Sequence, residues 1–144
     1  MIELDEDIKR RLESAIEDQK VLAAAYVDVH GKPHISFYGS THVHSTDQLA
    51  MWARNPEGEL IRTLPERPDI AFIYGDVGSR VYYTFEGRGR VTTDEAERNR
   101  IYDEMHPIER QFDADKNGIA VVVDLDKVTS LSAATGKQVM EREG

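Results

Sequence analysis

Residues 80–92, RVYYTFEGRGRVT, are the stretch that decides the fold. Apolar and aromatic residues stand at every second position from Val81 to Phe85, and this two-residue period predicts a strand. Gly87 and Gly89 follow in the same run, and glycines inside a strand mark a bulge or a sharp bend. Bent strands let a small sheet curve into a barrel, so this stretch predicts a curved antiparallel sheet.

The sequence on both sides of this stretch predicts more strands than helices. A turn with Gly31 and Pro33 joins the first two strands as a hairpin, Thr92 with Glu95 fits a capping box, and Pro107 ends the helix begun there. The predicted strands are residues 20–29, 34–40, 48–54, 69–75, 80–92, 118–125 and 127–132, and the other predicted helices are residues 4–19 and 57–64. Strands and helices do not alternate strictly. The predicted fold is therefore mainly β (α+β): a six-to-seven-stranded antiparallel barrel with flanking helices, in a single domain over residues 1–144.

Two stretches predict burial and order. Residues 69–75, DIAFIYG, are apolar almost throughout, which predicts a strand buried on both faces. The polar stretch from about residue 133 predicts a loose C-terminal tail. A third stretch, with Ala23, Ala24 and Ala25, predicts a strand of little bulk against which another body can lie closely.

Composition excludes several classes of protein. The chain has 27 acidic and 18 basic residues and a net charge of −9, whereas a nucleic-acid surface needs clustered lysine and arginine. It has no cysteine, which excludes disulfides, thiolate metal sites and a cysteine nucleophile. No apolar run approaches the ~18 residues of a membrane span, and the sequence is charged from its third residue. We expect a cytoplasmic protein that binds neither nucleic acid nor membrane, although a few arginines can still hold a small anion.

Residues 49–67, LAMWARNPEGELIRTLPER, carry the strongest candidate chemistry. They predict a strand that ends in Trp52, Ala53 and Arg54, followed by a short helix that carries Arg62. A guanidinium presents a planar fork of donors that fits two phosphate oxygens, and a helix N-terminus adds unpaired N–H groups. The segment therefore predicts a site for a phosphorylated cofactor. The alternative is that Trp52 lies in the core and both arginines are solvated surface charges.

Two histidines stand in the next candidate segment. His42 and His44 are predicted to lie in a loop and on one side of it if the loop is extended, so they could share a metal ion. A third ligand would be needed, such as His34 or an acid, and none is recognisable at a suitable spacing. We therefore predict no metal site, and interpret both residues as polar histidines near the mouth of a ligand site.

The order of HGKPHISFYGS, LAMWAR, a short helix, RPDIAFIYGD, RVYYTFEGRGRVT, a helix and HPIERQFDADKNGIAVVVDLDKVTSL resembles the pyridoxamine 5′-phosphate oxidase-like split β-barrel family of flavin-binding proteins. The resemblance covers residues 5 to about 132. It rests on this order and on a few positions: Gly31, Pro33, Arg54, Pro68, and Glu86 with Gly87. It implies a split β-barrel, bound FMN, and a homodimer with two flavin sites at the subunit interface.

The resemblance also assigns site residues. The second strand and the turn after it would lie along the isoalloxazine ring, Trp52, Ala53 and Arg54 would follow the ribityl chain toward the phosphate, and Tyr82 would meet the flavin of the neighbouring subunit. The residues along the ring would be Ser36, Phe37, Tyr38, Gly39 and Ser40.

The chain departs from the oxidase itself at its phosphate and substrate contacts. The Ser-Arg-Lys clasp for the flavin phosphate falls on Gly58, Glu59 and Leu60, and the arginine and lysine of the second strand fall on Ser36 and Thr41. These departures speak against oxidation of pyridoxamine phosphate. Arg54 and Arg62 are the expected substitutes for the lost phosphate partners.

Three functions follow as hypotheses. The first is an FMN-dependent oxidoreductase that acts on a small-molecule substrate of unknown identity, with no catalytic acid assigned. The second is a deazaflavin-dependent reductase on the same barrel, whose longer acidic tail would need Arg54, Arg62 and Lys32. The third is a stress-associated protein that holds flavin without turnover, or haem through His34 or His42.

Overall fold

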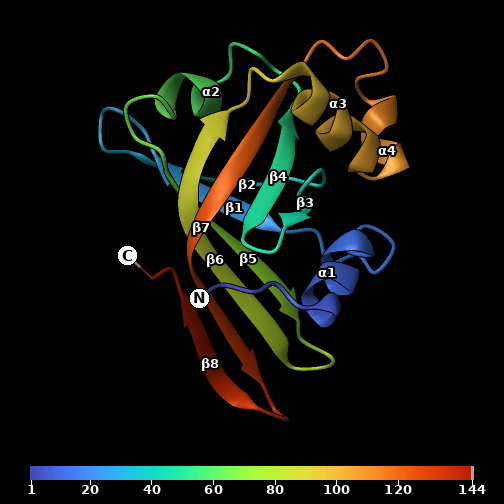
Figure 1. The fold of residues 1–144 in the computed structure, drawn as a ribbon, viewed down its shortest axis with the longest axis vertical. Helices are drawn as coiled ribbons and strands as arrows, with labels where there is room; N and C mark the ends of the chain where they lie inside the picture. The colour runs from blue at the N-terminus through green and yellow to red at the C-terminus, as the bar shows by residue number, and fades with distance from the viewer. Residues whose placement is uncertain (144) are drawn as a thin grey trace.

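One antiparallel sheet forms the body of the protein in a computed structural model, which describes residues 1–143 (Figure 1). The strands are β1 (Ala23–Val27), β2 (Pro33–Phe37), β3 (His42–Ser45), β4 (Gln48–Ala53), β5 (Asp69–Asp76), β6 (Val81–Val91), β7 (Ile119–Ser132) and β8 (Gly136–Glu141). The helices are α1 (Glu6–Glu13), α2 (Glu59–Thr63), α3 (Glu95–Glu104) and α4 (Pro107–Gln111). The strand order is β2-β1-β5-β6-β7-β4-β3, and β8 pairs with β7 beside this path. The predicted mainly β (α+β) antiparallel split barrel is confirmed, with eight strands where six to seven were predicted.

The bend predicted in the long strand β6 is a β-bulge. The register between β6 and β7 shifts between Glu86 and Gly87. A Cβ atom on Gly87 would lie 2.4 Å from the carbonyl oxygen of Asp124, so the close approach of β7 requires glycine. On β7, Asp126 has no partner residue on β6 in this register, and its exposed carboxylate binds Arg88 at 3.0 Å. The sequence predicted two strands at 118–125 and 127–132, whereas the structure has one continuous strand, because Asp126 is accommodated in the bulge.

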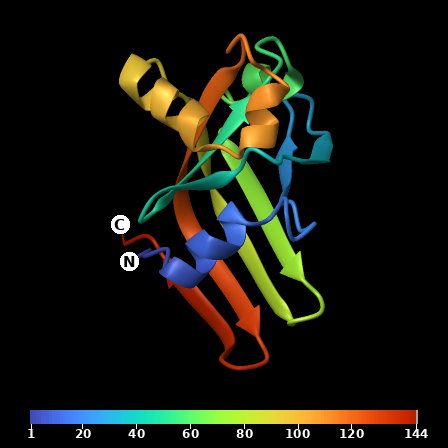
Figure 2. The same ribbon diagram turned by 90° about the vertical axis from the view of Figure 1, so that its right-hand side faces the viewer.

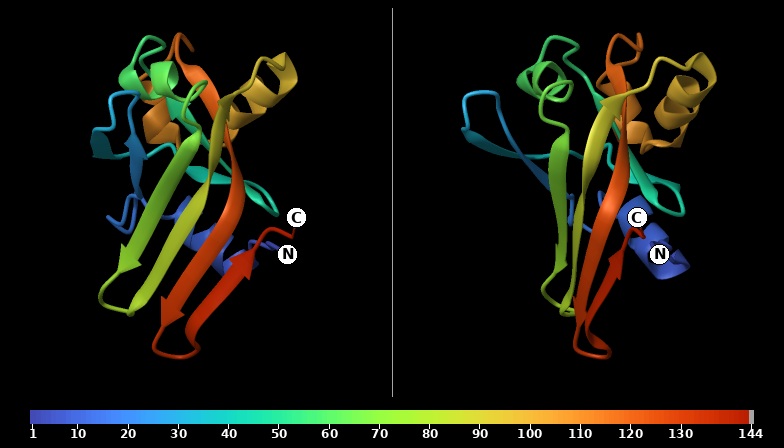
Figure 3. Two further views of the ribbon diagram at one scale, coloured as in Figure 1. Left: turned by 90° about the vertical axis from the view of Figure 1, so that its left-hand side faces the viewer. Right: turned by 60° about the vertical axis from the view of Figure 1, so that its left-hand side comes forward.

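The long hairpins β5–β6 and β7–β8 extend away from the end of the molecule that carries α2, α3 and α4 (Figures 2 and 3). The N-terminus lies beside the end of β8 at the middle of the molecule, where the N-terminal amine donates to the carbonyl oxygen of Glu141 at 2.8 Å. The segment predicted as a loose tail is the edge strand β8. Its polar composition suits a strand that pairs only with β7 and leaves most of its side chains in solvent.

Two apolar clusters form the core, one on each face of β4 and β7. The larger cluster includes Leu49, Met51 and Phe85 and is covered by α1. The smaller cluster includes Trp52 and Ile101 and lies under α3. Strand β4 and the first half of β7, residues 120–123, are therefore buried on both faces. The prediction that residues 69–75 are buried on both faces is wrong, because only one face of β5 is covered within a single copy of residues 1–143, which leaves Ile73 51% exposed.

Helix ends account for three further differences. Helix α1 ends at Glu13, short of the predicted residue 19, and the chain continues in turns to Gln19, whose φ is 60°. Asp94 caps α3 by accepting from Ala96 N at 3.2 Å, in place of the predicted Thr92. Pro107 does not only follow α3, since it is the first residue of α4, where its missing N–H costs no hydrogen bond.

Candidate functional site

An open groove of about 1310 Å³ runs between β2, the end of β4 and the neighbouring edges of β5 and β6. Its size exceeds that of most small-molecule sites, so a ligand of nucleotide size fits it. All the residues predicted to bind the cofactor line this groove except Arg62. They are Ser36, Phe37, Tyr38, Gly39, Ser40, Trp52, Ala53, Arg54 and Tyr82.

Small residues leave space at the floor of the groove. Ala23 lies between Phe37 on β2 and Ile73 on β5 in the sheet register, and Gly75 lies opposite Tyr82 on β6. Because Ala23 and Gly75 have small side chains or none, the surface of the sheet is hollowed at these positions between bulkier side chains. The prediction that the alanine strand offers little bulk to an approaching body agrees with this geometry.

Ser40 fixes the two walls of the groove relative to each other. If the pairing of β3 with β4 continued past His42, Ser40 would be the partner of Trp52. The Ser40 hydroxyl takes the place of the backbone hydrogen bonds that this pairing would have made. Ser40 Oγ accepts from Trp52 N at 2.9 Å and donates to Trp52 O at 3.2 Å. Ser40 is only 2% exposed, so its hydroxyl is committed to the backbone and the residue acts by positioning.

Trp52 is a core residue, as the alternative interpretation had it. Its indole N–H donates to Asp113 Oδ2 at 2.7 Å, and its ring meets Tyr102 edge-on with 5.0 Å between centroids. Burial raises the pKa of Asp113, but hydrogen bonds from Trp52 and from two backbone N–H groups outweigh it, and the pKa is lowered. A Cβ atom on Gly118 would lie 2.5 Å from both the indole nitrogen and the carbonyl oxygen of Ala53. Trp52 therefore anchors the end of β4 in the core and in this way fixes the position of Ala53 and Arg54.

The two predicted phosphate ligands do not lie together. Arg54 is exposed at the groove, where its guanidinium lies over the ring of Phe112 at 5.0 Å, and no ion pair within residues 1–143 engages it. Arg62 borders a separate hollow and pairs with Glu59 at 2.6 Å. The i,i+3 spacing within α2 turns Arg62 toward Glu59 and away from Arg54. Of the two guanidiniums, only that of Arg54 is placed to meet an anion in the groove.

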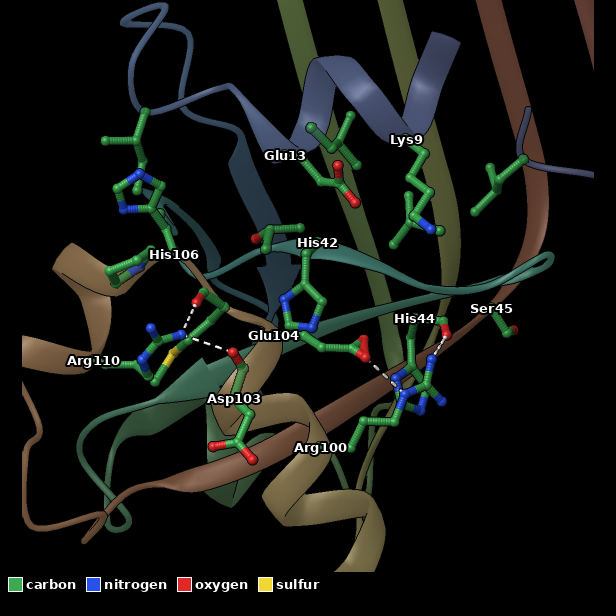
Figure 4. Close-up of a pocket in the computed structure, with 18 of the residues that line it drawn as sticks. Lys9, Glu13, His42, His44, Ser45, Arg100, Asp103, Glu104, His106 and Arg110 are labelled. Carbon is green, nitrogen blue, oxygen red and sulfur yellow. Dashed lines mark hydrogen bonds and ion pairs between the residues drawn. The ribbon is translucent and has the colours of Figure 1, made fainter. Parts of the chain in front are cut away.

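His42 and His44 lie on strand β3, where the sequence predicted a loop, and both are buried. They line a second cavity of about 640 Å³, into which Lys9 and Glu13 of α1 and Arg100 and Glu104 of α3 also project (Figure 4). This cavity adjoins the groove at Gly39 and Ile16. The two histidines are therefore not at the mouth of the groove, because β3 turns their side chains toward α3, where His44 meets Glu97.

Each of these histidines has one ring nitrogen without a partner. Since a carbonyl oxygen only accepts, His42 Nδ1 donates to Ser40 O at 2.8 Å, and Nε2 keeps a buried lone pair. Burial lowers the pKa of His42, which favours the neutral ring. His44 Nε2 bonds the Glu97 carboxylate at 3.0 Å, and its Nδ1 is unpartnered.

A third hollow, of about 500 Å³, lies between the β1–β2 turn and α2. Asp28 lies at its centre, and it was not identified from the sequence as a candidate site residue. Asp28 Oδ1 accepts from His30 N at 2.8 Å and Lys32 N at 3.0 Å, and Oδ2 meets His34 Nε2 at 2.8 Å. The hydrogen bond from His34, followed by those from the backbone, lowers the pKa of Asp28 to about 2. An aspartate at the start of a His-Gly turn is the signal that could have identified it.

The strands and helices together define a split β-barrel, and solved structures have the same fold. A Clostridium acetobutylicum protein related to general stress protein 26 of B. subtilis, of the pyridoxinephosphate oxidase family, has a TM-score of 0.68 and 11% identity, covering 95% of this chain and 96% of its own. A NimC/NimA family protein of the same organism has a TM-score of 0.70 and 10% identity, covering 93% and 92%. A heme binding protein from Mycobacterium smegmatis has a TM-score of 0.65 and 13% identity, covering 91% and 57%.

The chain therefore has the pyridoxamine 5′-phosphate oxidase-like fold. No protein-family model and no curated protein sequence matches it. Among the helices of residues 1–143, none is long and apolar enough to cross a membrane.

Proposed function

We propose that the protein is an FMN-binding oxidoreductase that holds the cofactor in the groove along β2. The observation that carries this proposal is the convergence on one groove of the β2 segment, Ala53 with Arg54, and Tyr82. These residues come from distant parts of the sequence. FMN supplies the electron-transfer chemistry when bound, and the chain supplies position and polarity.

The phosphate end of the ligand is assigned to Arg54. Its guanidinium has no carboxylate partner within the described chain, so it is available to an anion without breaking an ion pair. A charge-assisted contact contributes about 1.5 to 3 kcal/mol when partly desolvated. Lys20 also lines the groove, but its ammonium lies 3.9 Å from Asp76. Arg54 is therefore the main source of affinity for phosphate in this proposal.

The ring end is assigned to the low floor of the groove at Ala23 and Gly75, with Phe37 and Tyr82 beside it. Burial raises the pKa of the half-buried Tyr38, so its hydroxyl stays protonated and can donate a hydrogen bond to a ring oxygen or nitrogen.

A second copy of the chain is expected to complete this site. Register places Ile35, Phe37, Ile73 and Leu131 on the same open face of β2, β5 and β7, where they are 74%, 75%, 51% and 48% exposed. Exposed apolar side chains that gather beside a ligand groove indicate an interaction surface. We therefore propose a homodimer in which this face covers the open side of the groove and brings the partner close to Tyr82.

The visible spectrum of freshly purified protein tests the proposal against the two rival cofactors. Bands at about 370 and 450 nm indicate flavin, one band near about 420 nm indicates a deazaflavin, and a Soret band indicates haem. Mass analysis of the released molecule separates FMN from longer flavins. A deazaflavin or haem would refute the assignment to FMN. If the protein is purified without cofactor, binding of added FMN decides the question.

A further inference from the structure

Three potential metal ligands converge in the hollow between the β1–β2 turn and α2. They are Asp28, just after β1, His34 on β2 and Glu59 at the start of α2. One donor atom from each lies within 4.8 Å of the other two. The sequence offered His34 only as a possible third ligand beside His42 and His44, and it gave no sign of this group, because the three residues come from separate segments that only the fold brings together.

Two of the three side chains are already held in a fixed orientation. The ring of His34 stacks on Tyr26, with centroids 4.8 Å apart and planes 7° from parallel. Asp28 uses Oδ1 for two backbone N–H groups and points Oδ2 at His34 Nε2. Ligands of metal ions in proteins are typically oriented by such outer hydrogen bonds.

We propose that Asp28, His34 and Glu59 bind one divalent transition-metal ion of the Zn²⁺ class. One imidazole with two carboxylates suits Zn²⁺, and the open hollow leaves room for water as a fourth ligand. Tetrahedral donors with bonds of about 2.0 to 2.1 Å lie about 3.3 Å apart. Asp28 Oδ2 and His34 Nε2, at 2.8 Å, are close to this spacing.

Binding requires two local changes. Glu59 exchanges its exposed ion pair with Arg62 for the metal ion, which costs little because exposed ion pairs contribute little free energy. His34 Nε2 must present its lone pair to the ion, so the neutral ring carries its single proton on Nδ1 when the metal is bound. The proposal does not depend on the flavin, although Glu59 also borders the cofactor groove.

Isothermal titration of the untagged chain with ZnCl₂ at neutral pH tests the site. We expect one Zn²⁺ per chain. His34→Gln and Glu59→Gln should each weaken binding by about tenfold or more. His30→Gln and Glu66→Gln are matched controls, since both residues line the same hollow outside the donor group, and they should bind as the parent does.

Circular dichroism and thermal melting confirm that each variant folds. Glu59 lies at the surface, so Glu59→Gln keeps the test valid if His34→Gln proves unstable. The proposal is overturned if no Zn²⁺ binds or if Glu59→Gln binds as tightly as the parent. It is also overturned if His42→Gln removes binding while His34→Gln does not, because the ion would then occupy the cavity under α1.

Discussion

Replacement of Ser40 by alanine should destabilise the protein strongly although it removes one oxygen atom. The hydroxyl satisfies both the N–H and the carbonyl of Trp52 at a point that β3 does not reach, and both groups are buried. Each buried polar group left without a partner costs about 1 to 3 kcal/mol, so we expect a loss of about 3 kcal/mol. For a chain of this length that corresponds to a fall in Tm of roughly 10 °C.

Urea denaturation at one protein concentration measures this loss. The midpoint should fall while the slope of free energy against urea stays constant, since the surface exposed on unfolding hardly changes. Ser36→Ala is the matched control, because Ser36 is exposed on β2, and it should change stability by less than about 0.5 kcal/mol. A Ser40→Ala variant as stable as Ser36→Ala would refute the argument that this hydroxyl replaces the β3–β4 ladder.

Three further predictions concern the β-bulge at Gly87, the turn that begins at Asp28, and the open face of the sheet that carries Phe37. Gly87→Ala should cost about 2 to 4 kcal/mol in urea denaturation, because its Cβ would lie 2.4 Å from a backbone oxygen; an unchanged midpoint would contradict this. The folded-state pKa of Asp28 is about 2 against a usual 3.8, so its contribution to stability is present above about pH 3.8 and is lost as the pH falls through about 2. The free energy of unfolding of Asp28→Asn should therefore depend less on pH in that window, and an identical acid dependence would count against it. Phe37→Asp should shift sedimentation toward monomer, whereas Val77→Asp, an equally exposed residue of the β5–β6 turn, should not; equal behaviour of both would refute the proposed dimer face.

Local sequence patterns predicted the bent strand and the first hairpin correctly. Gly87 stands at the bulge because the approach of β7 leaves no room for a side chain, and this constraint is visible in the sequence. The rule that an apolar strand is buried on both faces holds for β4 and for the first half of β7 but fails for β5. Periodicity alone cannot show which strands lie under a helix, because this depends on the order of strands in the sheet.

Long-range pairing accounts for most of what the sequence did not predict. β8 is polar and becomes a strand only because β7 offers it an edge. His42 and His44 become buried because β3 pairs with β4 and their side chains lie between β3 and α3. The separation of Arg62 from Arg54 follows from which face of α2 meets the groove, a property that a five-residue helix does not reveal in sequence.

Titration of cofactor-free protein with FMN, followed by quenching of flavin fluorescence, tests the central claim most directly. We predict that Arg54→Ala raises the Kd for FMN about tenfold or more, equivalent to about 1.4 kcal/mol, with the fold intact. Arg62→Ala, a guanidinium of the same chemistry in the neighbouring hollow, should bind FMN with the affinity of the parent. Unchanged affinity in Arg54→Ala, or a larger loss in Arg62→Ala, would contradict a phosphate site at the end of β4.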